Sequence, residues 1–113
     1  MCIFEERIYT IQPGRLNEYL KRYRDFGYKV QTKHLGKPIG YFTSEIGDLN
    51  LVIQLRQYES YLDRNTRRLA MESDPDWIAY RKSNSLQIKQ KNRILKSLDF
   101  CSLHCETSES NEN

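Results

Sequence analysis

The stretch Lys33–Ser60, KHLGKPIGYFTSEIGDLNLVIQLRQYES, decides the fold. It contains two runs in which apolar and polar residues alternate, and a period of two is typical of β-strands. The first run passes through Ile39, Tyr41 and Thr43, and the second passes through Leu49, Leu51, Ile53 and Leu55. Gly47 and Asp48 lie between the runs and supply the positive-φ residue and the short polar side chain of a tight reversal. The stretch therefore predicts a β-hairpin with a four-residue turn, followed by a helix start.

The residues before the hairpin predict one strand and one helix. Residues 2–12 alternate, and both faces carry apolar as well as charged residues, which is typical of a strand covered on both sides. An amphipathic helix should follow, with an apolar stripe made of Leu16, Tyr19, Leu20, Tyr23 and Phe26. We expect Gly27 to end this helix through a left-handed cap, which leaves residues 28–36 as a connection.

The residues after the hairpin predict two helical segments and a last strand. Ser60 is a suitable N-cap for a helix over residues 61–71. Asp74–Pro75 combines a cap with a proline in the first turn and predicts a second helical start. Residues 86–98 alternate again and form the last strand.

This order, β-α-β-β-α-β, predicts an α+β fold of the ferredoxin-like type, a four-stranded antiparallel sheet with both helices on one face. If the leucine-rich side of the third strand faces the helices, the opposite face carries Val52, Gln54, Arg56 and Tyr58. So mixed a sheet face in a small chain favours a homodimer. Two sheets facing each other would form a dimeric α+β barrel and remove their open edges.

Length and charge indicate the domain organisation and the kind of partner that the chain can attract. The 113 residues suit one domain over residues 1–98, followed by an acidic tail over residues 99–113 that we expect to be disordered. All 18 Lys and Arg residues lie before residue 97, so the body is basic. A basic body can attract nucleic acid, but no aromatic-interleaved motif accompanies it. We interpret it as a solvated face and expect no nucleic-acid partner.

The sequence also bears on location. No apolar run approaches the roughly 20 residues of a membrane span, so we expect no membrane association. The first strand begins directly after Met1, which leaves no room for a targeting peptide. Cys2, Cys101 and Cys105 are odd in number and lie at the chain ends, unlike a disulfide framework. We therefore predict a cytoplasmic protein.

A set of polar residues on the predicted strands forms the best candidate site. Its members are Glu5, Arg7, Tyr9, Gln54, Arg56, Tyr58 and Asn92. In a closed barrel the arginines could hold an anionic ligand while Tyr or Glu moves a proton. The alternative is structural: the same residues satisfy one another across the dimer in an Arg–carboxylate network.

Two other groups of residues are candidates for a functional site. His34 could act as a general base, or it could be a surface or capping residue. Cys101, His104 and Cys105 have neither the order of a haem-attachment motif nor the four ligands of a structural zinc site. We therefore expect no metal site and no cofactor.

With these elements placed, the chain resembles the NIPSNAP family of small dimeric α+β-barrel proteins. The resemblance spans residues 3 to about 96 and rests on CIFEERIYTIQPGRLNEYL, KHLGKPIGYFTSEIGDLN, Tyr58 with Ser60, DRNTRRLAMESDPDW and QKNRIL. It implies a ferredoxin-like fold, a homodimer and no established enzymatic reaction. The chain departs from the family pattern at Glu6, Gln54, Arg56 and Lys91, so a ligand preference can differ from that of relatives.

These observations leave two functions open. The first is a small-molecule-binding or protein-interaction module. The second is a cofactor-independent enzyme, monooxygenase-like or isomerase-like, acting on a small apolar or aromatic substrate. Its candidate catalytic residues are Arg7, Tyr9, Arg56 and His34. Phosphate loops, a Ser-His-Asp order and nucleotide fingerprints are absent from the sequence, so most common enzyme classes are not indicated.

Overall fold

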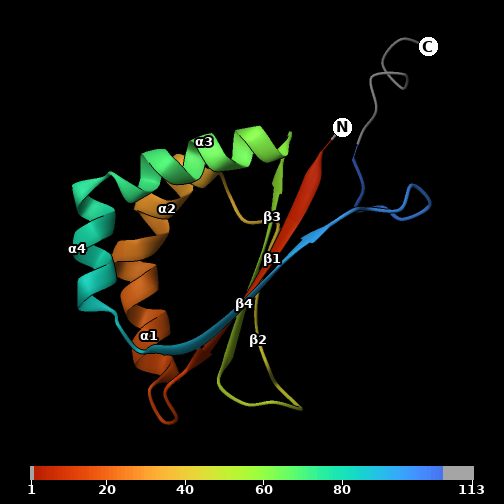
Figure 1. Cartoon of the computed structure of the whole chain (residues 1–113). Helices are drawn as coiled ribbons and strands as arrows, with labels where there is room; N and C mark the ends of the chain where they lie inside the picture. The colour runs from red at the N-terminus through yellow and green to blue at the C-terminus, as the bar shows by residue number, and fades with distance from the viewer. Residues whose placement is uncertain (1, 106–113) are drawn as a thin grey trace.

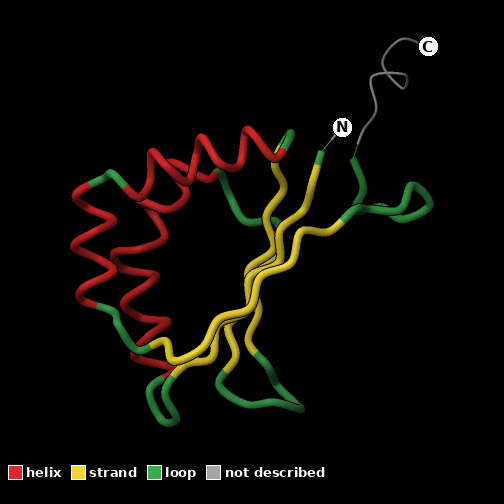
Figure 2. The backbone as a smooth tube through the Cα atoms, viewed as in Figure 1, coloured by secondary structure: helices red, strands yellow, loops and turns green. Residues whose placement is uncertain are grey.

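The computed structural model describes residues 2–105 (Figure 1). Residues 106–113, which include most of the predicted tail, lie outside the described residues. One antiparallel sheet contains β1 (Ile3–Ile11), β2 (Gly40–Thr43), β3 (Leu51–Tyr58) and β4 (Gln87–Leu95) in the order β2-β3-β1-β4. The helices all lie on one side of this sheet (Figure 2). The predicted ferredoxin-like α+β fold is therefore confirmed.

The first helical region is longer than the sequence predicts. It consists of α1 (Leu16–Arg22), a π-helical segment η1 (Tyr23–Gly27) and α2 (Tyr28–Leu35). Gly27 has a right-handed φ of −84° and does not end the helix, so both the predicted cap and the predicted connection over residues 28–36 are wrong. Gly27 is needed for another reason, because a Cβ there would lie 2.6 Å from the Tyr80 ring. The left-handed residue that follows the helix is Gly36, with φ +81°.

The second helical region agrees with the sequence. It consists of α3 (Tyr61–Glu72) and α4 (Pro75–Ser83). The Ser60 hydroxyl accepts from the Asp63 backbone N–H at 3.0 Å, and Asp74 accepts from the backbone N–H of Asp76 at 2.9 Å. Both predicted caps are confirmed.

The hairpin turn differs from the prediction. β2 ends at Thr43 and β3 begins at Leu51, so the loop covers residues 44–50 and is longer than a four-residue turn. Two residues in the loop have positive φ, Gly47 at 106° and Asn50 at 64°. The Asn50 carbonyl also accepts from the Ile11 N–H at 2.8 Å, which ties the loop to the end of β1.

The two faces of β3 are the reverse of the predicted ones. In the register of β1 and β3, Arg56 lies opposite Glu5 and Gln54 lies opposite Arg7. These residues are buried beneath the helices, as are Val52 and Tyr58. The leucine-rich side of β3 lies on the uncovered face, where Ile53 opposes Ile8. The prediction was wrong because the helices contribute tyrosine and arginine side chains to this layer, and polar strand residues find their partners there.

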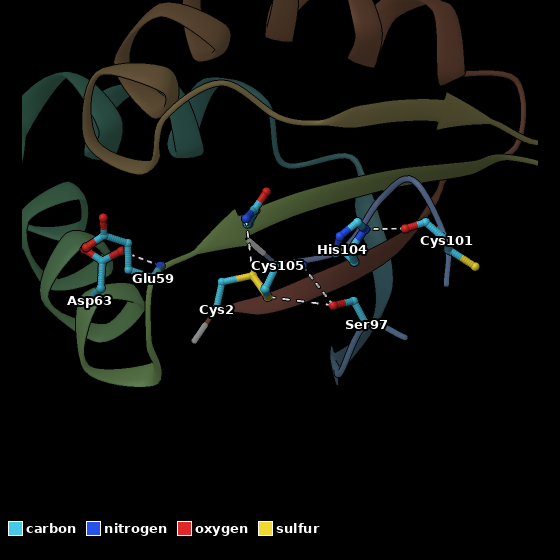
Figure 3. The surroundings of a disulfide bond; sticks show 8 residues. Cys2, Glu59, Asp63, Ser97, Cys101, His104 and Cys105 are labelled. Atoms are coloured by element: carbon cyan, nitrogen blue, oxygen red, sulfur yellow. Dashed lines mark hydrogen bonds between the residues drawn. A yellow bond between two sulfur atoms is a disulfide. The ribbon is translucent and has the colours of Figure 1, made fainter. Parts of the chain in front are cut away.

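A disulfide joins Cys2 to Cys105, with the Cα atoms 5.4 Å apart (Figure 3). The sequence did not predict this bond. It forms because β4 pairs with β1, so the chain leaving β4 lies beside the start of β1. Residues 99–105 form turns and bends, and the Ser97 hydroxyl accepts from the Cys105 N–H at 3.2 Å. Within residues 2–105 no helix is long and apolar enough to cross a membrane.

Candidate ligand-binding cavity

A cavity of about 170 Å³ lies between the sheet and the helices. Strand β1 contributes Arg7 and Tyr9 to its wall, and Gln54 comes from β3. The helical side of the wall includes Tyr19, Tyr23, Arg68, Trp77 and Tyr80. Its exposed lining residues, Arg81, Ser85 and Gln90, come from α4, the following loop and β4. The cavity therefore opens between α4 and the β4 edge of the sheet.

Beside the cavity, the Glu5 carboxylate is held by several donors. Arg64 of α3 donates to both of its oxygens, at 3.0 and 2.8 Å. Arg7 donates at 3.1 Å and Asn92 at 3.3 Å. Burial alone raises the pKa of the Glu5 carboxyl, but the bonds from Arg64 and the charges of Arg7 and Arg64 outweigh it and lower the pKa. Glu5 is thus an ionised group whose role in this network is structural.

Arg56 is a buried cation with no carboxylate partner within residues 2–105. Its guanidinium, 1% exposed, donates to neutral oxygens: Gln31 Oε1 at 3.0 Å, Gln54 Oε1 at 3.4 Å and the Gly36 carbonyl. A buried positive charge without a counter-ion is costly, and neutral acceptors offset only part of that cost. Arg56 therefore adds an uncompensated positive charge to the layer that contains the cavity.

The wall of the cavity contains polar groups without a partner. Arg68 Nη2 lies 3.6 Å from the half-exposed carboxylate of Glu72, but Arg68 Nη1 is buried and has no hydrogen-bond partner within residues 2–105. The same holds for Trp77 Nε1 and Asn84 Oδ1. Burial and the neighbouring charge of Arg7 lower the pKa of Arg68 from its ordinary value. Within residues 2–105 the other unpaired buried atoms are Thr32 Oγ1 and Tyr58 OH, on residues that do not line the cavity. Most buried polar atoms in proteins are hydrogen-bonded, so three such atoms on residues of one cavity wall require an explanation.

The tyrosines in the cavity wall are hydrogen-bonding groups. Burial raises the pKa of Tyr19, Tyr23 and Tyr80 above its ordinary value. The Tyr9 oxygen accepts from Arg7 Nε at 2.8 Å, and the Tyr80 oxygen accepts from Asn84 Nδ2 at 2.8 Å. Because both oxygens act as acceptors, their own hydrogens can be donated to a molecule in the cavity.

The structure separates the residues that the sequence singled out. Arg7, Tyr9 and Gln54 line the cavity. The remaining members of the predicted set share the covered sheet face without lining it: Glu5, Arg56, Tyr58 and Asn92. The sequence missed the helical half of the wall. A signal was present, because Tyr19 and Tyr23 occupy a helix stripe where leucine would pack without polar atoms.

His34 does not reach the cavity. It lies in the last turn of α2, and its Nε2 is 2.7 Å from Asp74 Oδ2, at the start of α4. This bond, together with the capping bond from the Asp76 N–H, lowers the pKa of Asp74 to about 2. Asp74 is the N-cap of α4, and His34 contacts its carboxylate outside the cavity.

The near-terminal Cys and His residues take part in other contacts. His104 contacts the Cys101 carbonyl, and Cys105 is in the disulfide (Figure 3). Within the described part of the chain, no three His, Cys, Asp or Glu residues are placed to hold a metal ion.

Comparison with known proteins identifies the family of this chain. The NIPSNAP family model matches residues 4–102. The chain belongs to the NIPSNAP family. A NIPSNAP family protein from Agrobacterium tumefaciens is 42% identical, with a TM-score of 0.89 over 92% of this chain and all of that one. A second NIPSNAP family protein from that organism, of unknown function, is 35% identical, with a TM-score of 0.87 over 90% of this chain and 93% of that one.

Two further proteins are similar to this chain, one over part of its own length and one in fold. The NipSnap homolog of Dictyostelium discoideum is 34% identical over 67% of this chain, and the matched region spans only 33% of that longer protein. A candidate antibiotic biosynthesis monooxygenase from Nitrosomonas europaea shares the fold, with a TM-score of 0.63 at 11% identity over 87% of this NIPSNAP chain and 91% of that chain.

Proposed function

We propose that this NIPSNAP protein binds a small organic molecule in the cavity between its sheet and its helices. One observation carries the proposal: Arg68, Trp77 and Asn84 all line the same cavity, and each has a buried polar atom with no hydrogen-bond partner within residues 2–105. An unsatisfied buried polar group costs about 1–3 kcal/mol. A ligand that forms hydrogen bonds with these atoms would remove that cost and bind more tightly.

The size of the cavity fits a ring-sized ligand. A cavity of about 150 Å³ holds benzene, and this one measures about 170 Å³. Trp77 and Tyr80, whose ring centroids are 5.2 Å apart, both line the cavity and give its wall an aromatic part. Larger ligands, such as nucleotides, would need the helices to move.

The single tryptophan allows a direct test, because Trp77 lines the cavity. We expect ring-sized compounds to change Trp77 fluorescence saturably, and native mass spectrometry of gently purified protein to detect any retained small molecule. Ile46→Ala is the control, because Ile46 lies in the loop between β2 and β3 and is 92% exposed. Binding that is lost in Ile46→Ala, or a Trp77 signal that no compound changes, would contradict the proposal.

We also propose that the protein is a homodimer through the uncovered sheet face. Ile8, Ile53 and Leu55 lie on that face without helix cover, and Phe42 lies over Gly40 at its β2 edge. A second copy packed face to face would cover these apolar side chains.

Sedimentation of two matched variants tests the dimer. Ile53→Glu places a charge in the centre of the uncovered face and should give a monomer near 13.5 kDa. Ile46→Glu places the same charge on a side chain that is 92% exposed in the loop before β3, and should leave the dimer intact. A monomeric wild-type protein at micromolar concentration would end this proposal.

Binding ranks ahead of catalysis for a structural reason. Two of the predicted catalytic residues do not line the cavity, since His34 bonds Asp74 at the start of α4 and Arg56 lies beside the wall. A cofactor-independent enzyme would have to act through Arg7 and Tyr9, which are in contact at 2.8 Å. A new product in mass spectra after incubation with a bound compound would favour the enzyme.

For the location, the cytoplasm is our proposal. The exposed thiol of Cys101 is the supporting observation, because free exposed cysteines are kept reduced there. The Cys2–Cys105 bond would then be exposed to cellular reductants. Cell fractionation, with thiol labelling of the recovered protein, tests both statements.

A further inference from the structure

We infer that the ligand of this cavity is a small organic anion, a ring-sized compound with one carboxylate or an equally compact oxyanion. The inference deepens the proposed binding function and rests on it. It follows from the charges of the layer that contains the cavity, from the unpaired donors in the wall and from the size of the space.

The charge balance beneath the helices is positive. Four guanidinium groups lie between sheet and helices or at the margin of that layer, those of Arg7, Arg56, Arg64 and Arg68. Within residues 2–105 the one buried carboxylate is that of Glu5, and of the four arginines only Arg7 and Arg64 donate to it. Arg64 takes both Glu5 oxygens and Arg7 shares one of them, so that carboxylate is saturated. A buried excess of cations is costly, and an anion between the helices and the sheet would offset it.

Arg68 is the group best placed to meet this anion. Its side chain is 14% exposed, it lines the cavity, and its nearest carboxylate oxygen, from Glu72, is 3.6 Å away at Nη2. Nη1 has no partner in the described part of the chain. A guanidinium binds a carboxylate through two parallel N–H donors, and one of them is unused here.

The other free groups in the wall favour the same ligand class. Among the cavity-lining residues, three have an unpaired buried polar atom within residues 2–105: Trp77 and Arg68 contribute donors, and Asn84 contributes an acceptor. The Tyr9 hydroxyl adds a further donor, because its oxygen already accepts from Arg7. Arg81 is exposed where the cavity opens, and a cation at the opening attracts anions from solution. The arrangement is rich in donors and poor in acceptors, which suits an oxyanion.

Benzoate and benzamide form the decisive pair of probes, because they have nearly the same size and shape but differ in charge. Isothermal titration and Trp77 fluorescence should show benzoate binding at least about tenfold more tightly than benzamide. Arg68→Gln should remove this preference. Arg67→Gln is the matched control, because Arg67 is next to Arg68 in the chain but pairs with Asp63 on the surface and does not line the cavity. It should keep the preference.

Each outcome has a distinct meaning. Equal affinity for benzoate and benzamide overturns the inference and leaves the binding function standing. A preference that survives Arg68→Gln overturns the placement of the anion at Arg68. Failure of both probes and of other ring-sized compounds overturns the binding function itself. Arg68→Lys guards against a folding defect in Arg68→Gln, because it keeps the charge and loses the paired donors; it should retain part of the preference.

Discussion

Replacing Glu5 by glutamine removes the one carboxylate at the centre of the buried arginine network. The shape of the side chain is preserved, but Arg64 loses two charge-assisted bonds and Arg7 loses its ion pair. Removing one partner of a buried ion pair costs about 3–5 kcal/mol, because the remaining charges stay buried without compensation. Since a domain of this size has a free energy of unfolding of about 5–15 kcal/mol, Glu5→Gln should remove a large share of the stability.

Urea unfolding followed by Trp77 fluorescence measures this loss. With a urea dependence of about 1.5 kcal/mol per molar, the midpoint should fall by about 2–3 M. Glu6→Gln provides the matched control one residue away. Glu6 pairs with Arg93 on the uncovered face, where Arg93 is largely exposed, so its removal should cost about 0–1 kcal/mol.

Equal midpoints for Glu5→Gln and Glu6→Gln would refute the reasoning, because they would show that the buried network adds nothing beyond a surface ion pair. A second comparison uses Arg64→Met in the Glu5→Gln background. This double variant removes one of the uncompensated cations, so it should recover part of the lost stability. Failure to recover any would show that the loss has another cause than buried positive charge.

Three further predictions follow from the same structure. The lowered pKa of Glu5 stabilises the fold above the ordinary value of 4.5, and this stabilisation should be lost as pH falls through the folded-state pKa, as an acid titration of the urea midpoint would show. Gly27→Ala should lower the melting temperature by an amount equivalent to about 1–2 kcal/mol, because the new methyl group overlaps the Tyr80 ring and this outweighs the gain in helix propensity. Cys2→Ser opens a link that spans 103 residues and should cost about 2–4 kcal/mol in urea unfolding without reductant, whereas Cys101→Ser should leave the midpoint unchanged.

The order of the elements could be predicted from the sequence because each signal was local. The alternation in β1 and β3 and the caps at Ser60 and Asp74 all correspond to elements of the structure. The burial of a strand face is not a local property. In β3 the aliphatic side, which includes Ile53, faces away from the helices, and the side with Arg56 is buried beneath them. Hydrophobicity alone predicts the reverse, and only the partners on the helices decide it.

The same limit applies to the cavity. Its strand side, Arg7, Tyr9 and Gln54, was among the predicted residues because polar side chains within a strand pattern are conspicuous. Its helical side was not, because Tyr23 resembles an ordinary core position in a helix stripe. Gly27 resembled a helix end, and no local pattern distinguishes a terminating glycine from one that allows the Tyr80 ring to approach closely.

The π-helical segment η1 determines how a deletion of one residue would affect this helical region. A π turn closes its hydrogen bonds one residue further along than an α turn, so it accommodates an extra residue within the helix. Deleting one residue, such as the exposed Asp25, should therefore let residues 16–35 wind as a regular helix, while the helix faces before and after the deletion keep their directions. Gln31 would still face Arg56, 3.0 Å from it here. A NIPSNAP sequence with a one-residue gap between Tyr23 and Gly27 is therefore expected to lack the π segment and to keep this contact in its cavity wall.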